Sequence, residues 1–349
     1  MKQAYLFFFV LILLSSCHKD NGSAIGSGSV IVINEGGYGH GDADISVYDP
    51  ATHAVSNNIF KAENGFSLGD VAQSLYLIGD TTAFIVMNNS ARVVVANAKN
   101  NFKYQYSINI AGSFPRFFLP VDSSKAYVTE LYNNNIYVVN YKTGALLRTI
   151  AVSGSTEQMV AWGGKVYVAE ASKPYLGTGP VPTSVHAILE IDPTTDQIVH
   201  TVNLASDPNS MTLVQNSLYV LTSSDTPSVK ASIYNIDIAS LSVNSKTDFA
   251  AGHNPNFLRY SAPANQLLYS DSGGIYAMSP TASLVPTAPF IASNNWNVYG
   301  LNADPVSGDI YISDAVDYQQ ASHIMRYSQT GSALDHFTAG IITNGFVFK

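Results

Sequence analysis

Short runs of alternating apolar and polar residues, separated by Gly, Asn, Asp and Ser, follow one another from Val30 to the end of the chain. The apolar positions, which are mostly Val, Ile, Tyr and Phe, recur with the two-residue period of a β-strand. No sustained run after Ser29 has the 3.6-residue period of an amphipathic helix. Because the separating residues are typical of tight turns, the pattern predicts an all-β protein.

The strand pattern repeats. One unit comprises four predicted strands joined by tight turns, at Phe114–Pro120, Lys125–Glu130, Asn135–Asn140 and Leu146–Val152. The second strand of this unit recurs at 82–88, 165–170, 217–222, 266–271 and 309–314. The period is about 45 residues, which is the length expected of a four-stranded propeller blade.

The two ends of the repeat predict how the ring closes. Six first strands are expected to begin near Val71, Pro115, Gln158, Asn209, Asn256 and Val298. Val30–Asn34 matches a second strand but has no first strand before it, whereas an extra strand follows at Gly340–Phe348. We therefore expect residues 30–349 to form a seven-bladed β-propeller in which the C-terminal strand pairs with the N-terminal blade. The alternative is a pair of β-sandwich domains with sheets stacked face to face.

The first residues have the pattern of a lipoprotein signal peptide. Lys2 precedes an apolar run from Tyr5 to Leu14, which is too short to span a bilayer. Small residues precede Cys17, so we expect residues 1–16 to be cleaved and Cys17 to be lipidated. The Gly- and Ser-rich residues 17–29 would then form a flexible tether. The alternative is an ordinary signal peptide that happens to be followed by a cysteine.

Composition narrows the classes of partner. The formal net charge is −8 and no basic block occurs, which argues against nucleic acid as a partner. Charged residues make up 12% of the chain, about half the usual share, so polar uncharged residues cover much of the surface. Cys17 is the only cysteine and excludes an internal disulfide. This composition suits an extracellular protein that meets neutral polar ligands.

A propeller of this topology predicts where a binding site would lie. Loops that join one blade to the next lie on the same face as loops between second and third strands, and both surround one mouth of the central channel. Taken singly, the polar residues in these loops are explained as turn formers. Together they would surround the mouth with amides, acids and aromatic rings. The predicted ligand-binding residues are Asn34, Glu35, Gln73, Asn88, Arg116, Glu130, Tyr132, Gln158, Glu170, Asn209, Asn256, Asp271, Trp296, Tyr299, Asp314 and Asn344.

The remaining motifs give weaker evidence about the binding site. The Gly-rich segment Gly36–Asp44 is not followed by a helix and lacks most calcium ligands, so we interpret it as a flexible hairpin loop. Tyr175–Ser184 and Asp317–Gln320 lengthen two loops on the expected binding face. The eight histidines show no metal-binding spacing, and no metal site is predicted. His40 and His253 are kept as candidate ligands to a metal-centred guest.

Several segments resemble a family of lipid-anchored surface β-propellers. They are Ile33–Gly39, Ile45–Asp49, Gly69–Ser74, Val86–Ser90, Pro115–Arg116, Ala126–Thr129 and Glu157–Met159. The blade repeat is also similar to that of YVTN-type propellers. Some members of the lipid-anchored family capture cobalamin and pass it to an outer-membrane TonB-dependent transporter. The resemblance therefore implies a propeller fold and a role in corrinoid capture, but it assigns no cobalamin contact to a residue. Lys19 and Asp20 after Cys17 resemble the surface-export signal of Gram-negative lipoproteins, which implies the outer membrane and the cell surface, with a periplasm-facing anchor as the alternative.

These observations favour a binding protein that captures a small polar ligand and presents it to an outer-membrane transporter. No catalytic residue and no cofactor are predicted. One alternative is a cation-dependent lactonase or lyase, in which Glu35, Glu130, Glu170, Asp271 and Asp314 would supply the cation ligands. Another alternative is a flat platform that binds a protein or a glycan.

Overall fold

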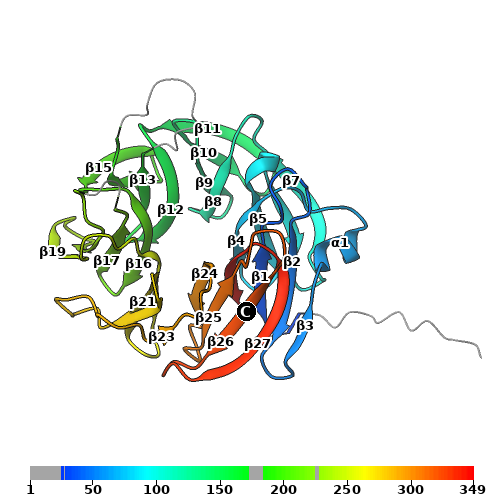
Figure 1. Ribbon diagram of the computed structural model, residues 1–349. Coiled ribbons are helices and arrows are strands. Elements are labelled where there is room, and N and C mark those ends of the chain that lie inside the picture. The colour runs from blue at the N-terminus through cyan, green and yellow to red at the C-terminus, as the bar shows by residue number, and fades with distance from the viewer. Residues whose placement is uncertain (1–24, 27, 173–183, 225–227) are drawn as a thin grey trace, which may run out of the picture.

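In the computed structural model, the chain forms a ring of seven four-stranded antiparallel sheets around a central axis (Figure 1). The structure describes residues 25–26, 28–172, 184–224 and 228–349. The prediction of a seven-bladed propeller is confirmed, and the pair of stacked sandwiches is excluded. The signal peptide and Cys17 lie outside the described residues, so both stay predictions. No helix in the described ranges is long and apolar enough to cross a membrane.

Each blade runs outward from the central axis through four strands, and the first blade takes its innermost strand from the C-terminus. The first three blades are β28 Thr343–Phe348, β1 Val30–Asn34, β2 Asp44–Asp49 and β3 Ala54–Ser56; β4 Ala72–Ile78, β5 Thr82–Met87, β6 Arg92–Asn97 and β7 Lys103–Asn109; and β8 Pro115–Pro120, β9 Lys125–Glu130, β10 Asn135–Asn140 and β11 Ala145–Ala151.

The other four blades follow in sequence order around the ring. They are β12 Ser155–Trp162, β13 Lys165–Ala171, β14 Ala187–Asp192 and β15 Gln197–Asn203; β16 Pro208–Val214, β17 Ser217–Thr222, β18 Ser232–Asp237 and β19 Val243–Asp248; β20 Asn256–Ser261, β21 Gln266–Asp271, β22 Gly274–Met278 and β23 Ile291–Ala292; and β24 Val298–Ala303, β25 Ile310–Asp314, β26 Ala321–Tyr327 and β27 Ala333–Ile341.

The main differences from the sequence prediction are two strand starts and two short helical elements. β12 begins at Ser155, three residues before the expected start at Gln158. The closing strand begins at Thr343 because the preceding residues extend β27, the outermost strand of the last blade. A short helix, α1 (Ile59–Asn64), and a 3-10 turn, Asn88–Ser90, were not predicted, since six and three residues are too few to show a helical period.

Burial explains why the second strand gives the clearest sequence signal. β1 and β5 are almost entirely buried because blades pack on both of their faces, so their sequences are nearly continuous apolar runs. The outermost strands β11 and β19 are mostly exposed, and β19 is correspondingly polar, whereas β11 exposes Leu146 and Leu147. The hydrophobic clusters lie between neighbouring blades, as where Val138 of one blade and Leu189 of the next share a cluster. The blades therefore stabilise one another.

Tyrosines of the second strands tie successive blades together. The hydroxyl of Tyr127 donates to Asp196 Oδ1 of the next blade at 2.5 Å. Tyr167 donates to the carbonyl of Ile238 at 3.2 Å, and Tyr219 donates to the carbonyl of Pro280 at 2.9 Å. A Tyr ring fills the apolar space between two sheets while its hydroxyl reaches a polar partner beyond. The repeated Tyr-Val pattern thus reflects an inter-blade contact.

The ring closes where β28 pairs with β1 in antiparallel register, from Val30 opposite Phe348 to Asn34 opposite Thr343. The predicted closure is confirmed. Asn34, which is 2% exposed, joins the two ends of the ring. Its Oδ1 accepts from the Thr343 hydroxyl at 2.6 Å and from the Gly340 amide at 3.0 Å, while its Nδ2 donates to Ser46 Oγ at 2.9 Å. A Cβ at position 340 would lie 2.6 Å from Asn34 Cγ, which explains the glycine there.

Replacing Asn34 with alanine should destabilise the propeller. The change leaves the buried Thr343 hydroxyl and the Gly340 amide without their acceptor, so we expect the free energy of unfolding to fall by about 2 kcal/mol or more. Urea titration followed by circular dichroism measures this change. The control is Asn244→Ala on the exposed strand β19, which should alter stability by less than about 0.5 kcal/mol. Equal effects of the two variants would contradict a closing role for Asn34.

Candidate functional site

A ring of side chains surrounds the mouth of the channel because every innermost strand begins irregularly. In each blade the pairing of this strand with its neighbour shifts register within the first residues. Such a bulge inserts a residue outside the ladder and re-aims its side chain. The matching positions of the seven strands, hereafter the mouth ring, are Gln73, Arg116, Glu157, Asn209, Asn256, Tyr299 and Asn344.

Arg116 is the charged centre of one side of the mouth ring. Its Nε donates to both carboxylate oxygens of Glu157, at 3.0 and 2.9 Å, and its Nη1 donates to Gln73 Oε1. The side chains of Arg116 and Glu157 are 22% and 19% exposed, so this ion pair is largely shielded from water. Although burial disfavours the charged guanidinium, the carboxylates of Glu157 and Glu35 raise the pKa of Arg116. Arg116 is therefore held charged at the mouth.

Glu35 follows β1 and is buried beside this pair. Its Oε1 accepts from Asn344 Nδ2 at 2.7 Å, and its Oε2 accepts from the Tyr299 hydroxyl at 3.3 Å. Burial raises the pKa of Glu35, and the hydrogen bond from Asn344 and the nearby charge of Arg116 oppose this shift. Burial and the neighbouring Glu35 carboxylate also raise the pKa of Tyr299. The sequence-predicted residues Glu35, Arg116, Tyr299 and Asn344 thus form one electrostatic unit.

Two pockets open at the mouth and share Tyr299. The first, which we call the charged lobe, has a volume of about 360 Å³. It is lined by Glu35, Gly36, Tyr38, Val71, Gln73, Asn88, Arg116, Tyr132, Tyr299 and Ile342. Tyr38 is 75% exposed and stands in the loop between β1 and β2. Tyr132 meets Phe114 edge to face at 4.9 Å.

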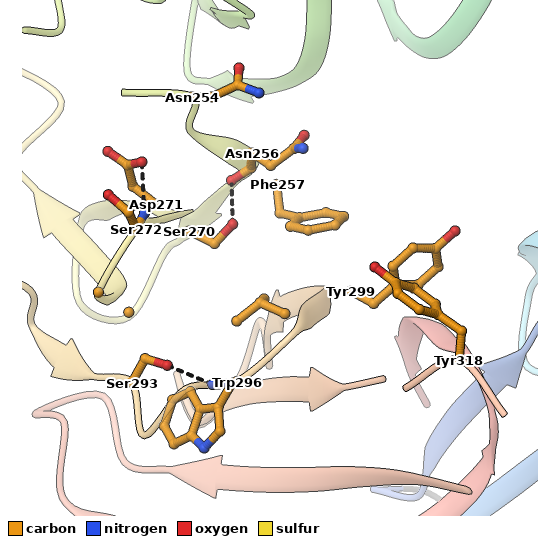
Figure 2. Close-up of a pocket in the computed structure, with 13 residues that line it drawn as sticks. Asn254, Asn256, Phe257, Ser270, Asp271, Ser272, Ser293, Trp296, Tyr299 and Tyr318 are labelled. Carbon is orange, nitrogen blue, oxygen red and sulfur yellow. Dashed lines mark hydrogen bonds between the residues drawn. The ribbon is translucent and has the colours of Figure 1, made fainter. Parts of the chain in front are cut away.

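The second pocket, which we call the aromatic lobe, has a volume of about 390 Å³ (Figure 2). It is lined by Asn254, Asn256, Phe257, Ser270, Asp271, Ser272, Gly273, Gly274, Ser293, Trp296, Val298, Tyr299 and Tyr318. Tyr299 and Tyr318 meet edge to face at 5.6 Å. Both volumes fall within the range of about 300–1,000 Å³ that is typical of small-molecule sites.

Seven of the sequence-predicted residues line neither pocket, and in five of these the side chain accepts hydrogen bonds from backbone amides instead. Glu130 accepts from the amides of Phe114 and Tyr132 at 2.8 and 3.0 Å. Glu170, Asp314 and Asn34 likewise accept from backbone amides of nearby turns. These side chains stabilise the conformation of the loops around the mouth. The fifth residue is Gln158.

The structure places Gln158 between blades, where its Oε1 accepts from the Met211 amide at 2.9 Å. Glu157 takes the mouth-ring position in its place, because β12 begins earlier than expected. Asn209 belongs to the mouth ring, and its Nδ2 donates to the carbonyl of Pro255 at 2.8 Å. The other predicted residues, apart from Asn344, line a pocket: Glu35, Gln73, Asn88, Arg116 and Tyr132 in the charged lobe, Asn256, Asp271 and Trp296 in the aromatic lobe, and Tyr299 in both.

Sequence reasoning missed Glu157 of the mouth ring and several pocket-lining residues, among them Tyr38, Asn254, Phe257 and Tyr318. The blade alignment could have found Glu157, and the lengthened loop at Asp317–Gln320 points to Tyr318. Phe257 reaches the pocket through a backbone φ of 59°, which no residue pattern reveals.

The structure describes the Gly-rich loop singled out in the sequence and the surroundings of His253. Gly36–Asp44 is a hairpin loop between β1 and β2, as expected, and the Gly37 amide donates to Asp42 Oδ1 at 2.8 Å. Residues 173–183 of the other long loop lie outside the described residues. His253 Nδ1 lies 2.6 Å from Asp271 Oδ2. Among the described residues, no three His, Cys, Asp or Glu side chains form a group that could hold a metal ion.

Comparison with known families places the chain. Residues 28–339 match a family profile described as a domain of unknown function, DUF5074. The chain belongs to this family. The match covers most of the ring and ends before β28, and no curated protein sequence matches the chain.

Solved structures of low sequence identity share the fold. A quinoprotein alcohol dehydrogenase-like protein from Bacteroides thetaiotaomicron is 17% identical with a TM-score of 0.70, over 94% of this chain and 79% of that protein. The hydrazine synthase of Kuenenia stuttgartiensis is 15% identical with a TM-score of 0.63, over 78% and 87% of the two chains. BamB from Moraxella catarrhalis is 14% identical with a TM-score of 0.54, over 90% and 84%. At these identities the likeness supports the propeller fold alone.

The buried carboxyl of Glu35 should make stability depend on pH. Because burial raises its pKa in the folded state, the folded chain binds the proton of Glu35 more readily than the unfolded chain. The stabilising contribution is complete below the unfolded pKa of about 4.3 and is lost as pH rises through the folded value. The unfolding free energy of the wild type minus that of Glu35→Gln should therefore fall over the pH range above about 4.3, until Glu35 is ionised in the folded chain. Urea titrations across this range measure it, and a difference that is constant or grows with pH would contradict the assignment.

Proposed function

We propose that this protein binds a small polar ligand at the propeller mouth. The observation that carries the proposal is the charged lobe, which opens at the mouth beside Gln73, Arg116 and Tyr299 of the mouth ring. Amide and charged groups offer hydrogen bonds in fixed directions, and Tyr38, Tyr132 and Tyr299 offer flat apolar contact. The hollowed mouth favours a small molecule over a flat protein surface.

A corrinoid is the first candidate ligand. The periphery of a corrinoid carries amide groups, which Gln73, Asn88 and Arg116 can meet with donors and acceptors. The resemblance to lipid-anchored propellers that capture cobalamin supports the same candidate. The protein would then be held at the outer membrane by the lipid on Cys17, facing outward, and would pass its ligand to a TonB-dependent transporter. Co-purification of the full chain with such a transporter tests the partner.

A cation-dependent enzyme is less well supported. Of the five acids that would supply cation ligands, Glu130, Glu170 and Asp314 are engaged by backbone amides of turns. Glu35 and Asp271 lie in different lobes, so the acids do not converge on one point.

Titration of the purified protein with cyanocobalamin tests the proposal. We expect a saturable change in the absorbance spectrum at micromolar ligand, and Tyr38→Ala should weaken binding at least about tenfold because this exposed ring borders the charged lobe. The control is Tyr104→Ala on β7, an exposed tyrosine that contacts Phe66 away from both pockets. The absence of any spectral change or heat at micromolar cobalamin would remove the corrinoid as ligand.

A further inference from the structure

We propose that the aromatic lobe is a separate binding site for a neutral saccharide. This inference goes beyond capture of a corrinoid and does not depend on the charged lobe. It is carried by three features of the lobe: its aromatic faces, its amide and hydroxyl groups, and a single lining carboxylate among the described residues, which is already hydrogen-bonded within the protein.

The aromatic faces come from two neighbouring blades. Figure 2 shows Phe257 on one side of the pocket, Trp296 on another, and Tyr299 next to Tyr318 at one end. Tyr299 also lines the charged lobe. Trp296 follows β23, and its amide donates to Ser293 Oγ at 2.9 Å, which fixes the turn that carries the ring. The apolar C–H face of a pyranose ring packs on such flat side chains, and two or more of them can hold one ring from different sides.

The polar groups of the lobe suit hydroxyl ligands. The side chain of Asn256 is exposed and has no hydrogen-bond partner among the described residues, so its amide offers two donor hydrogens and an acceptor. Asn254 Oδ1 accepts from the Ser224 amide at 3.3 Å, which leaves its NH2 group directed to solvent. A planar amide that donates and accepts at once matches the vicinal hydroxyl groups of a sugar.

The charges of the lobe argue against an ionic ligand. Among the described residues, neither Lys nor Arg lines the lobe, and Asp271 is the one lining carboxylate. Asp271 accepts from the Ser272 amide at 2.7 Å and lies 2.6 Å from His253 Nδ1. An anion would meet no counter-charge here, and a cation would compete with partners that Asp271 already has. Neutral ligands incur neither penalty.

One wall of the lobe carries no side chain. Gly273 and Gly274 have φ values of 108° and 145°, and a Cβ at Gly274 would lie 2.1 Å from the carbonyl oxygen of Ile291. Only glycine fits there. Gly274 is buried against β23, whereas the exposed Gly273 leaves bare backbone beside Ser272. The volume of about 390 Å³ leaves room for one or more sugar rings.

Tryptophan fluorescence provides a direct test, because the chain has only two tryptophans. Trp162 lies on β12, outside both pockets, and Trp162→Phe leaves Trp296 as the sole reporter. We expect at least one of maltotriose, cellotriose and chitotriose to change the Trp296 emission with saturation, at a dissociation constant between about 10 μM and 1 mM. If none of the three changes the emission at about 10 mM, the proposal is overturned.

Calorimetry with variants assigns the site. Trp296→Ala should weaken the bound saccharide at least about tenfold, and Asn256→Ala, which alters an exposed side chain and should leave folding intact, should weaken it several-fold. Unchanged affinity in Asn256→Ala together with unchanged affinity in a folded Trp296→Ala would place binding elsewhere and overturn the proposal. Gln73→Ala in the charged lobe is the matched control and should leave saccharide affinity unchanged. Because cobalamin is titrated in a separate experiment, failure of the protein to bind cobalamin does not contradict saccharide binding, and failure to bind a saccharide does not contradict cobalamin binding.

Discussion

The antiparallel pairing of Thr343–Phe348 with Val30–Asn34 is the contact on which the other blades depend. Each hydrophobic cluster is shared between blades, so a blade without both neighbours would expose part of its core. The pairing joins the two ends of the described chain and gives the first blade its innermost strand. Asn34 strengthens it from inside, since one amide bonds to β28, to the end of β27 and to β2. The mouth exists only because this contact brings the first and last blades together.

The chemistry of the mouth follows from this closed geometry. Seven strands begin around one opening, and side chains distant in sequence become neighbours there. Glu35, Arg116 and Tyr299 come from three different blades, yet each alters the protonation equilibria of the others. On the other side of Tyr299 the lining changes to aromatic and uncharged polar groups, apart from Asp271. The mouth therefore has two chemically distinct halves, which no single blade could provide.

The fold could be predicted from the sequence because repetition reinforces a weak local signal. The first blade, which begins at Val30–Asn34, lacks an innermost strand, and the sequence has one extra strand at its C-terminal end. Counting the strands therefore predicted that the two ends pair and close the ring. The site was predictable only in part. A bulge of one residue decided between Glu157 and Gln158, and the same sequence pattern of an acid at a strand end describes both Glu35, which lines a pocket, and Glu170, which holds a turn. Phe257 enters the pocket through a left-handed backbone conformation that depends on tertiary context.

The register shifts at the start of the innermost strands separate recognition from stability. Most mouth-ring side chains belong to residues that the ladder passes over, so they take no part in the pairing that orders the sheets. Exchanging such a residue leaves the backbone bonds and the apolar interior in place. The ring of sheets can therefore act as a fixed frame around an interchangeable lining, in which new ligand preferences arise by single substitutions with little loss of folding free energy.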